Sequence, residues 1–299
     1  MEIAVTGSSG LIGTALMTRL TSDGHRPIAM VRRDPLPGAD EVRWDPAASV
    51  LDAASLEGIE AVVNLAGFGI GERRWNDQTK QLLLSSRIDS TRLLAATLAG
   101  LARRPSCLLS ASAVGFYGNR GDEALTEESS GGGGFVAEMA EAWEAETAPA
   151  REAGITTTLL RSGIVLSPHG GALAKMLPLF RLGLGGRFGR GDQYQSWITI
   201  DDEVGAIGFL LNNPVDGPAN LTAPNPVTNA ELTSALGAVL GRPALLPIPT
   251  FGPKLLLGSE MAQSLLFDSQ RVLPAVLDRA GYQFEHRDIA TGLAAVVER

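Results

Sequence analysis

The segment TGSSGLIG, residues 6–13, restricts the fold of this chain more than any other part of the sequence. It lies between a short apolar stretch, EIAVT at 2–6, and a helical pattern. A glycine-rich turn between a strand and a helix N-terminus lets main-chain amides contact the pyrophosphate of a dinucleotide. The other interpretation is an ordinary tight turn. The predicted cofactor-binding residues of this loop are Thr6, Gly7, Ser8, Ser9, Gly10, Leu11 and Ile12.

Strand-like and helix-like segments alternate through the first half of the chain. Long helical patterns cover 76–100 and 135–153. Apolar strands separated by helices form parallel sheets covered on both faces, with right-handed crossovers. We therefore expect an α/β fold with a Rossmann-like doubly wound parallel sheet. The predicted strands are at 2–6, 26–31, 41–44, 61–67, 106–112 and 156–163.

The composition changes after about residue 163, where turns rich in glycine and proline alternate with short helices. The stretch GLGGRFGRGDQ at 183–193 is one such turn. This predicts a smaller, loop-rich C-terminal lobe over the carboxyl ends of the strands. The predicted division is a dinucleotide-binding domain of residues 1–162 plus about 196–225, and a smaller substrate-side lobe of about 163–195 plus 226–299.

Charge and residue usage exclude several classes of protein. A formal charge of −8, from 33 acidic and 25 basic side chains, argues against a nucleic-acid surface. The single Cys107 excludes an internal disulfide, and the three scattered histidines give no metal-ligand spacing. The N-terminus has no secretory pattern, and no apolar run reaches the roughly 18 residues of a membrane-spanning helix. We therefore expect a cytoplasmic protein without a membrane segment or a metal.

The end of the second predicted strand bears on the choice of cofactor. The sequence VRRD puts Arg32 and Arg33 where a carboxylate usually meets the ribose of a cofactor without a 2′-phosphate. Arginine suits that phosphate, so the pair predicts NADP. In the other interpretation the arginines are solvated and Asp34 holds the ribose. Asp45, after the third strand, is placed either to contact the adenine or to cap the following turn.

Four motifs together make the sequence similar to a known family. Beside TGSSGLIG they are NLAG (64–67), SASAVGFYG (110–118) and SWITIDD (196–202). With these motifs the chain resembles, nearly from end to end, the extended, epimerase/dehydratase-like branch of the short-chain dehydrogenase/reductase superfamily. More narrowly, GLGGRFGRGDQYQSWI (183–198) and LLFDSQRVLPAVL (265–277) are similar to the YfcH-like subgroup. That subgroup is often described as sugar-nucleotide epimerases and carries a short C-terminal domain of unknown function.

The resemblance implies that the cofactor lies on the first lobe and an unidentified small-molecule substrate between the lobes. It implies that Leu65, Ala66 and Gly67 line the cofactor cleft. It also implies that Ser112 stands where the family has its active-site serine or threonine. Extended members often pair through two helices of the first lobe, so a homodimer is a further expectation, whereas nucleic acid and membranes are not expected partners.

The proton-transfer pair of the family is missing from this chain. In the family, a tyrosine exchanges a proton with the substrate while hydride moves to or from the nicotinamide, and a lysine four residues later lowers the tyrosine's pKa. Phe135 and Met139 occupy these positions here, and neither can donate, accept or carry a charge. Because removal of a positioned acid or base costs roughly 10²–10⁴ in rate, the ordinary mechanism cannot run.

Other residues are candidates to replace this pair. Arg87 falls where the family usually has an asparagine, and we predict that it supplies the cation at the cofactor in place of the lysine. Tyr117, expected near the cleft mouth, and Ser112 are the predicted catalytic residues; the alternative is that both make structural contacts at a strand end. Gln195 falls where sugar-nucleotide epimerases carry a diphosphate-binding arginine, which argues against a UDP-sugar. Trp143 is expected in the core.

Two functions of different class remain open at this point. One is an NADP-dependent oxidoreductase, or an epimerase that acts by transient oxidation, with a non-standard proton relay. The phosphate loop, the NLAG segment and the second lobe favour it. The other is an NADP-binding sensory or regulatory protein without turnover, favoured by the missing tyrosine and lysine. The four glycines at 131–134 fit both, because a mobile cleft wall suits either function.

Overall fold

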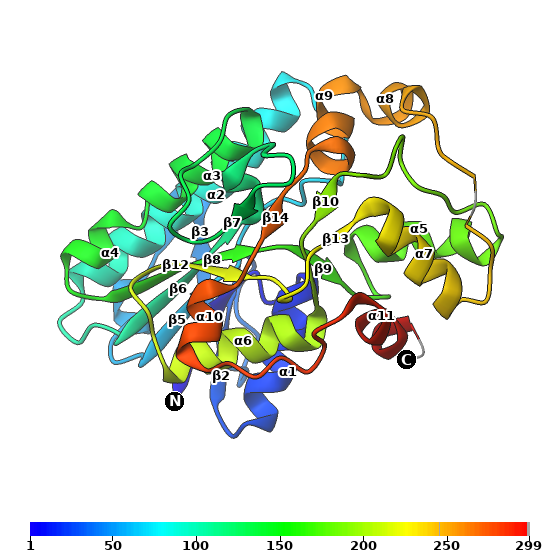
Figure 1. Ribbon diagram of the computed structural model, residues 1–299. Helices are drawn as coiled ribbons and strands as arrows, with labels where there is room; N and C mark the ends of the chain where they lie inside the picture. The colour runs from blue at the N-terminus through cyan, green and yellow to red at the C-terminus, as the bar shows by residue number, and fades with distance from the viewer. Residues whose placement is uncertain (245, 298–299) are drawn as a thin grey trace.

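The centre of the fold is an eight-stranded sheet (Figure 1). The computed structural model describes residues 1–244 and 246–297. The strand order is β12-β8-β6-β5-β1-β2-β3-β4, and every neighbouring pair is parallel except β3 and β4. The predicted Rossmann-like doubly wound sheet is therefore confirmed. The strands are β1 (Glu2–Thr6), β2 (Arg26–Val31), β3 (Glu41–Asp45), β4 (Val50–Leu51), β5 (Ala61–Asn64), β6 (Cys107–Ala113), β8 (Thr156–Ser162) and β12 (Gly217–Leu221).

The strand order reverses between β1 and β5. The strands β2, β3 and β4 follow on one side of β1, and β6, β8 and β12 follow on the far side of β5. Thr6 and Asn64, the last residues of β1 and β5, are paired in register. Ligands of open α/β sheets bind in the crevice at such a switch point, so this is where a dinucleotide is expected.

Helices cover both faces of the sheet. Successive residues of a strand point to opposite faces, and the apolar strands of this sheet therefore have apolar side chains to bury on both. Ile3 and Val5 of β1 belong to one apolar core, and Ala4 between them belongs to another. Figure 1 shows the two helical layers that bury these cores. One layer is α1 (Leu11–Ser22), α6 (Ile200–Asn212) and α10 (Ala275–Ala280), and the other is α2 (Asp77–Gly100), α3 (Phe135–Ala145) and α4 (Ala148–Glu152).

A smaller lobe stands at the carboxyl ends of the strands, on the right of Figure 1. Its apolar core includes Leu177, Trp197 and Leu293, from three separate parts of the chain. It contains two short strand pairs that are separate from the central sheet: β9 is parallel to β11, and β10 is antiparallel to β13. The elements are β9 (Ile164–Leu166), α5 (Gly171–Arg181), β10 (Tyr194–Gln195), β11 (Trp197–Thr199), β13 (Val227–Thr228), α7 (Asn229–Val239), α8 (Phe251–Leu257), α9 (Ser259–Ala262) and α11 (Ile289–Val297).

The C-terminal segment, residues 263–297, contacts both lobes. After α9 it forms β14 (Arg271–Val272), which pairs with β7 (Ala124–Leu125). It then packs α10 against the sheet and donates the amides of Glu285 and His286 to the buried Asp202 carboxylate, at 2.8 and 2.9 Å. Finally α11 returns to the core of the smaller lobe. The two lobes are therefore joined by more than the connections between strands.

Two predicted elements differ from those in the structure. The helix predicted over 135–153 is two helices, α3 and α4. Pro149 causes the break, because it has no amide hydrogen for a continuous helix and stands instead in the first turn of α4. The strand predicted over 61–67 ends at Asn64, because the next two amides bond to a hydroxyl group and leave the sheet.

Within residues 1–244 and 246–297, no helix has the length and apolar character needed to cross a membrane. The same ranges hold no group of three or more histidine, cysteine or acidic side chains arranged to bind a metal ion. Cys107 is buried in β6.

Candidate functional site

The loop between β1 and α1 has the steric features that its glycines predict. Gly7 has a φ of +64°, and a Cβ on it would lie 2.6 Å from the carbonyl oxygen of Leu65. A Cβ on Gly13 would lie 2.1 Å from the carbonyl oxygen of Gly7. A side chain at either position would displace backbone atoms, so the tight turn and the contact between helix and loop both depend on glycine.

Gly10 is less crowded than Gly7 and Gly13. A Cβ there would make one close contact, with the carbonyl oxygen of Gly7 at 3.2 Å. Gly10 is the N-cap of α1, where no side chain caps the helix and no acidic residue occupies the first turn. The first amides of a helix have no intrahelical partner and form its positive end, so they are available to an anion. Ser9, Gly10 and Leu11 line one end of a cavity of about 820 Å³ that extends along α1.

Ser8 and Ile12 are both partly buried. The carbonyl oxygen of Ser8 accepts a hydrogen bond from the Thr14 hydroxyl at 3.4 Å. The Ile12 side chain packs against the core that α1 shares with the sheet. Ile12 therefore has only its main-chain amide to offer a ligand.

A buried polar network closes the crevice beneath the loop. The Thr6 hydroxyl donates to Asn64 Oδ1 at 2.8 Å. It accepts hydrogen bonds from the amides of Leu65 and Ala66, at 3.0 and 3.1 Å. Asn64 in turn donates to the Thr91 hydroxyl of α2 at 2.9 Å. Thr6 thus shapes the crevice, because it holds the backbone after β5 at the place where the resemblance puts the cofactor.

Arg87 of α2 is a buried cation beneath the same backbone. Its Nη1 donates to the carbonyl oxygens of Phe68 and Leu83, at 2.9 and 3.1 Å, and its guanidinium lies 5.1 Å from the ring centroid of Trp143. Burial lowers the pKa of Arg87 to about 10, and its Nε has no hydrogen-bond partner. A Cβ on Gly67 would lie 3.3 Å from its Cζ. The glycine therefore allows the cation to lie close to the crevice, where its role toward the cofactor stays a prediction.

The two arginines after β2 are not equivalent. Arg33 donates two hydrogen bonds to Glu41, at 2.8 and 2.5 Å, and this contact lowers the pKa of Glu41. Arg32 is exposed and forms no hydrogen bond or ion pair with the described residues. Asp34, the alternative ribose ligand, is paired with Arg43 at 2.6 Å. Arg32 can meet a 2′-phosphate directly, whereas Arg33 would first leave Glu41.

Asp45 caps the turn that follows β3. Its Oδ1 accepts hydrogen bonds from the amides of Ala47 and Ala48, at 3.1 and 3.3 Å. Of the two roles open for this residue, the structure shows the turn cap. Contact with the adenine stays a prediction.

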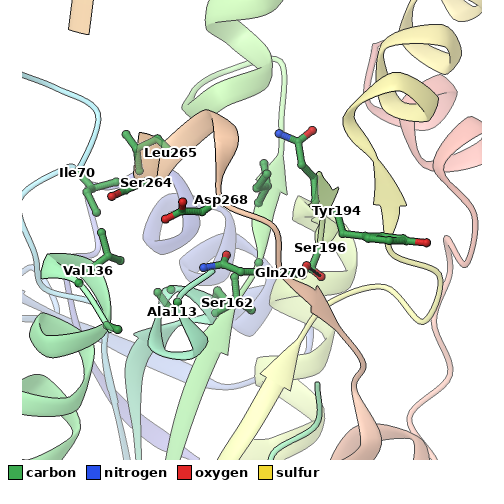
Figure 2. A pocket seen from close by; sticks show the side chains of 18 of the residues that line it. Ile70, Ala113, Val136, Ser162, Tyr194, Ser196, Ser264, Leu265, Asp268 and Gln270 are labelled. Atoms are coloured by element: carbon green, nitrogen blue, oxygen red, sulfur yellow. Dashed lines mark hydrogen bonds between the residues drawn. The ribbon is translucent and has the colours of Figure 1, made fainter. Parts of the chain in front are cut away.

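A second cavity, called the central cavity below, has a volume of about 200 Å³ and lies where β6 and β8 end (Figure 2). Its other walls are the start of α3, the β10 strand and the C-terminal segment. It thus lies between the two lobes, where the resemblance places the substrate. Within residues 1–244 and 246–297, no lysine, arginine or histidine lines it. The polar residues that line it are Ser162, Tyr194, Gln195, Ser196, Ser264, Asp268 and Gln270.

The helix that carries the tyrosine and lysine in the family has only apolar side chains at these positions. Phe135 packs edge-on against Trp75, with the ring centroids 5.2 Å apart, and Lys80 Nζ lies 4.9 Å from the Phe135 centroid. Met139 is buried. Neither position can transfer a proton. The residues of α3 that line the central cavity are Val136 and Ala137.

The four glycines before α3 divide into two pairs. A Cβ on Gly131 would lie 3.2 Å from the Phe116 ring, and one on Gly132 would lie 2.1 Å from a backbone carbonyl oxygen. Gly133 and Gly134 would meet nothing within 4 Å, and both line the central cavity. The hypothesis of a mobile cleft wall therefore narrows to the second pair.

Tyr117 lies inside the protein, so the prediction that it stands near the cleft mouth is wrong. The turn at 114–117 folds its ring into a small apolar cluster, where it is fully buried. Its hydroxyl donates to Asn220 Oδ1 at 2.8 Å and accepts a hydrogen bond from Arg161 Nη1 at 3.0 Å. Burial raises the pKa of Tyr117. A phenol whose hydrogen bonds are all made to buried groups is not placed to exchange a proton with a substrate.

Ser112 points away from the central cavity. Its hydroxyl donates to Glu144 Oε1 at 2.6 Å. Glu144 forms an ion pair with Arg161 at 2.8 Å, and their side chains are 9% and 5% exposed. Because successive strand residues point to opposite faces, the next residue, Ala113, lines the cavity instead. The structure thus brings Ser112 and Tyr117 to one buried cluster around Arg161, not to the substrate side.

An unpredicted carboxyl lies beneath the central cavity. Ser162, at the end of β8, lines the cavity, and its hydroxyl donates to Glu203 Oε1 of α6 at 2.6 Å. Glu203 is 1% exposed, and its Oε2 has no hydrogen-bond partner. Burial raises the pKa of Glu203 to about 8. The sequence could have indicated that Glu203 is buried, because the helical period places it on the same face of α6 as Ile207 and Leu210, which are buried.

Two family models match the sequence. One, described as the NAD dependent epimerase/dehydratase family, matches residues 3–222, and the other, a domain of unknown function (DUF1731), matches residues 248–296. An epimerase family protein of Mycobacterium bovis is 44% identical over 298 residues, covering 99% of this chain and 98% of that protein. The human epimerase family protein SDR39U1 is 37% identical over 303 residues, covering 99% of this chain and 100% of that protein.

Solved structures agree with these matches. The crystal structure of human SDR39U1 with NADPH has a TM-score of 0.92 and 34% sequence identity, and covers both chains completely. A nucleoside-diphosphate sugar epimerase from Corynebacterium glutamicum has a TM-score of 0.79 and 38% identity, covering 99% of this chain and 58% of that one. The chain therefore belongs to the NAD dependent epimerase/dehydratase family, the extended branch of the short-chain dehydrogenases/reductases, and carries its C-terminal domain of unknown function.

Proposed function

We propose that this protein is an NADP(H)-dependent oxidoreductase, or an epimerase that acts by transient oxidation, on a small molecule bound in the central cavity. One observation carries the proposal: the glycine loop and a polar cavity lie at the same edge of one sheet, at the ends of β1 and of β6 and β8. A protein that only bound a dinucleotide would not need the polar cavity. When bound, NADP(H) supplies or accepts a hydride at its nicotinamide.

Several groups of this chain would hold the cofactor. The uncapped amides at the start of α1 fit the pyrophosphate, because only a carbonyl oxygen approaches Gly10 from the protein side. Arg32 is the unpaired cation for a 2′-phosphate. The backbone from Leu65 to Gly67, held by Thr6, would form the edge of the cleft, with the charge of Arg87 beneath it. The human relative crystallised with NADPH supports this choice of cofactor.

The central cavity favours a small substrate without phosphate groups. Among the described residues that line it, Asp268 is the one carboxylate, and none is a cation that could neutralise a diphosphate. Gln195 lines the cavity at the position where sugar-nucleotide epimerases have an arginine, and its Oε1 accepts a hydrogen bond from Asn229 at 3.2 Å. Nearby, Arg190 is exposed and paired with Asp192 at 2.6 Å. A small aldehyde, ketone or alcohol fits these surroundings better than a nucleoside-diphosphate sugar.

Single-turnover oxidation of bound NADPH tests the proposal. The protein is held in excess over NADPH deuterated at nicotinamide C4, and the absorbance of the reduced ring is followed after addition of each member of a carbonyl panel. We expect loss of the signal, and deuterium in the product, with at least one compound. The Gly10→Val variant, which would block the phosphate site, is the control. Tight NADPH binding with no hydride transfer to any compound would overturn the proposal.

A second candidate function is an NADP-binding sensory or regulatory protein without turnover. The packing of Phe135 against Trp75 and Lys80 favours it, because the family's acid position has become part of an apolar and aromatic contact. This candidate predicts that NADPH changes the protease sensitivity of the glycine pair Gly133–Gly134 and transfers no hydride. Deuterium in any product of the single-turnover experiment would rule it out.

A further inference from the structure

We propose that Ser162 and Glu203 form a proton relay between a substrate in the central cavity and the buried carboxyl, in place of the missing tyrosine. The inference rests on the proposed function, since it supplies the proton for that reaction. Ser162 is the group that would touch the substrate, because it lines the cavity. Glu203 would act through Ser162 as the store of the proton.

The contact between the two side chains suits transfer in both directions. Ser162 Oγ and Glu203 Oε1 are 2.6 Å apart, the short separation that is typical of a strong hydrogen bond between oxygens. When the carboxyl is ionised, the hydroxyl donates to it. When the carboxyl carries a proton on Oε1, it can donate to Ser162, and the serine hydrogen is then free for a ligand in the cavity.

The neighbouring Asp202 shows how a buried structural carboxylate is satisfied in the same helix. It accepts hydrogen bonds from the amides of Glu285 and His286, at 2.8 and 2.9 Å, and from the Tyr282 hydroxyl at 3.2 Å. Glu203 has one serine and no cation, and its second oxygen has no partner. A buried carboxyl with so few partners is costly when charged, so its neutral form is favoured. A neutral buried carboxyl next to a cavity is a proton store.

Burial sets the proton affinity of Glu203. It raises the pKa of this carboxyl to about 8, while the hydrogen bond from Ser162 acts in the opposite direction. The titratable groups on the elements packed against α6 have contacts elsewhere and form no hydrogen bond or ion pair with Glu203 in the described part of the chain. They include Arg19 on α1, Cys107 on β6, and Tyr282, Glu285 and His286 in the C-terminal segment.

In the reductive direction, the oxygen of a bound carbonyl substrate would take the hydroxyl proton of Ser162, and NADPH held at the loop would supply the hydride for its carbonyl carbon. Ser162 regains a proton from Glu203, which is left as a carboxylate. Water that enters the cavity later returns the proton to Glu203. Oxidation of an alcohol reverses these transfers. An acid with a pKa near the working pH suits both directions, which favours Glu203 at neutral pH.

The first test needs no turnover. Infrared difference spectra of the wild-type protein and Glu203→Gln isolate the carbonyl stretch of a protonated Glu203. We expect this band below about pH 7 and its loss as the pH rises through about 8. An ionised Glu203 at pH 6 would overturn the relay and leave the proposed function intact.

The second test uses the substrate found by single turnover. Ser162→Ala and Glu203→Gln are expected to lower the hydride-transfer rate by roughly 10²–10⁴, with the Kd for NADPH unchanged. Glu203→Gln is also expected to remove the pH dependence that follows the carboxyl in the wild-type protein. Ser162→Thr, which keeps a hydroxyl, should restore most of the rate. Glu141→Gln, an exposed position on α3, is the matched control and should behave as wild type.

The outcomes separate the two proposals. Unchanged rates and pH profiles in Ser162→Ala and Glu203→Gln would overturn the relay, while hydride transfer by the wild-type protein would still support the proposed function. Absence of hydride transfer in the wild-type protein would overturn both.

Discussion

The two ends of the cleft are built from different parts of the chain. At the phosphate end the main chain is what a ligand meets: Gly7 and Gly13 have no room for a side chain, and no side chain caps α1. At the other end, where we propose that the reaction takes place and which is called the reaction end below, side chains from β8, α6 and the C-terminal segment meet around a cavity. The residues that the family uses there, at the positions of Phe135 and Met139, have been lost.

The contrast shows that binding and chemistry are constrained in different ways. A main-chain site depends on the few glycines that shape it, so it can stay unchanged while most other residues vary. A proton donor needs only the correct position and pKa, and any neighbouring strand or helix can supply it. The same cleft can therefore keep its cofactor end and acquire a different reaction end.

The largest effect is expected from the ion pair behind the reaction end. Glu144→Ala would leave Arg161 buried without its partner, and breaking such a pair typically costs about 3–5 kcal/mol in the free energy of unfolding. Urea denaturation measures this loss. Glu146→Ala, two residues along, removes the partner of the exposed Arg92 and should cost less than about 1 kcal/mol. Equal losses of unfolding free energy in the two variants would show that the buried pair stabilises the protein no more than the exposed one.

The phosphate end is tested next, by Gly10→Val. The backbone of Gly10 has a φ of −78°, which valine accepts, and a Cβ would lie 3.2 Å from the Gly7 carbonyl oxygen, a tight contact that a small shift of that oxygen relieves. We therefore expect a folded protein whose Kd for NADPH rises at least about 100-fold, or about 2.7 kcal/mol, by calorimetry. Gly100→Val, at the end of α2 with nothing within 4 Å, is the control. Unchanged affinity in Gly10→Val would mean that the amides of α1 do not hold the phosphates.

The pH dependence of stability sharpens the description of the reaction end. The pKa of Glu203 is about 8 in the folded protein and 4.5 in its ordinary state, so the folded protein binds the extra proton between these values. The resulting stability is present below the ordinary pKa and is lost as the pH rises through about 8. Glu203→Gln should reduce this loss and raise the Tm at about pH 8.5 by at least about 2 °C. Parallel Tm curves from about pH 5.5 to 8.5 for the two proteins would contradict it.

The smallest effect concerns the choice between NADP and NAD. Arg32→Ala should lower the ratio of NADPH to NADH affinity about 10-fold, or about 1.4 kcal/mol, because it removes an unpaired cation. Arg33→Ala should change the ratio less, since Glu41 already holds that guanidinium. Calorimetric titration of both cofactors measures the ratio. A larger effect from Arg33→Ala would mean that Arg33, and not Arg32, is the main contact of the 2′-phosphate.

The parts of the molecule that could be predicted from the sequence are those encoded by local pattern. The doubly wound sheet follows from apolar strands between helices, and the loop at 6–13 follows from glycines whose spacing has a steric cause. Trp143 was also correctly expected in the core, where it donates to Thr91 at 2.9 Å.

Which side chains line the central cavity could not be predicted, because this depends on the direction in which side chains point after distant elements meet. A shift of one residue along β6 exchanges Ser112 for Ala113 at the cavity. The turn after β6 buries Tyr117, and no local pattern indicated its direction. Ser162 and Glu203 are 41 residues apart, and only the packing of α6 on the sheet brings them together.

The route of the C-terminal segment bears on how a substrate of the proposed reaction would enter and leave. This segment forms one wall of the central cavity, then pairs with β7, binds Asp202 and ends in the smaller lobe. A hinge between the lobes would have to break those strand and carboxylate contacts at every opening. Gly133 and Gly134, at the opposite wall, have open space beside them, since a Cβ on either would meet nothing within 4 Å. For the proposed reaction, this favours exchange by local motion of a short loop over rigid-body closure of one lobe on the other.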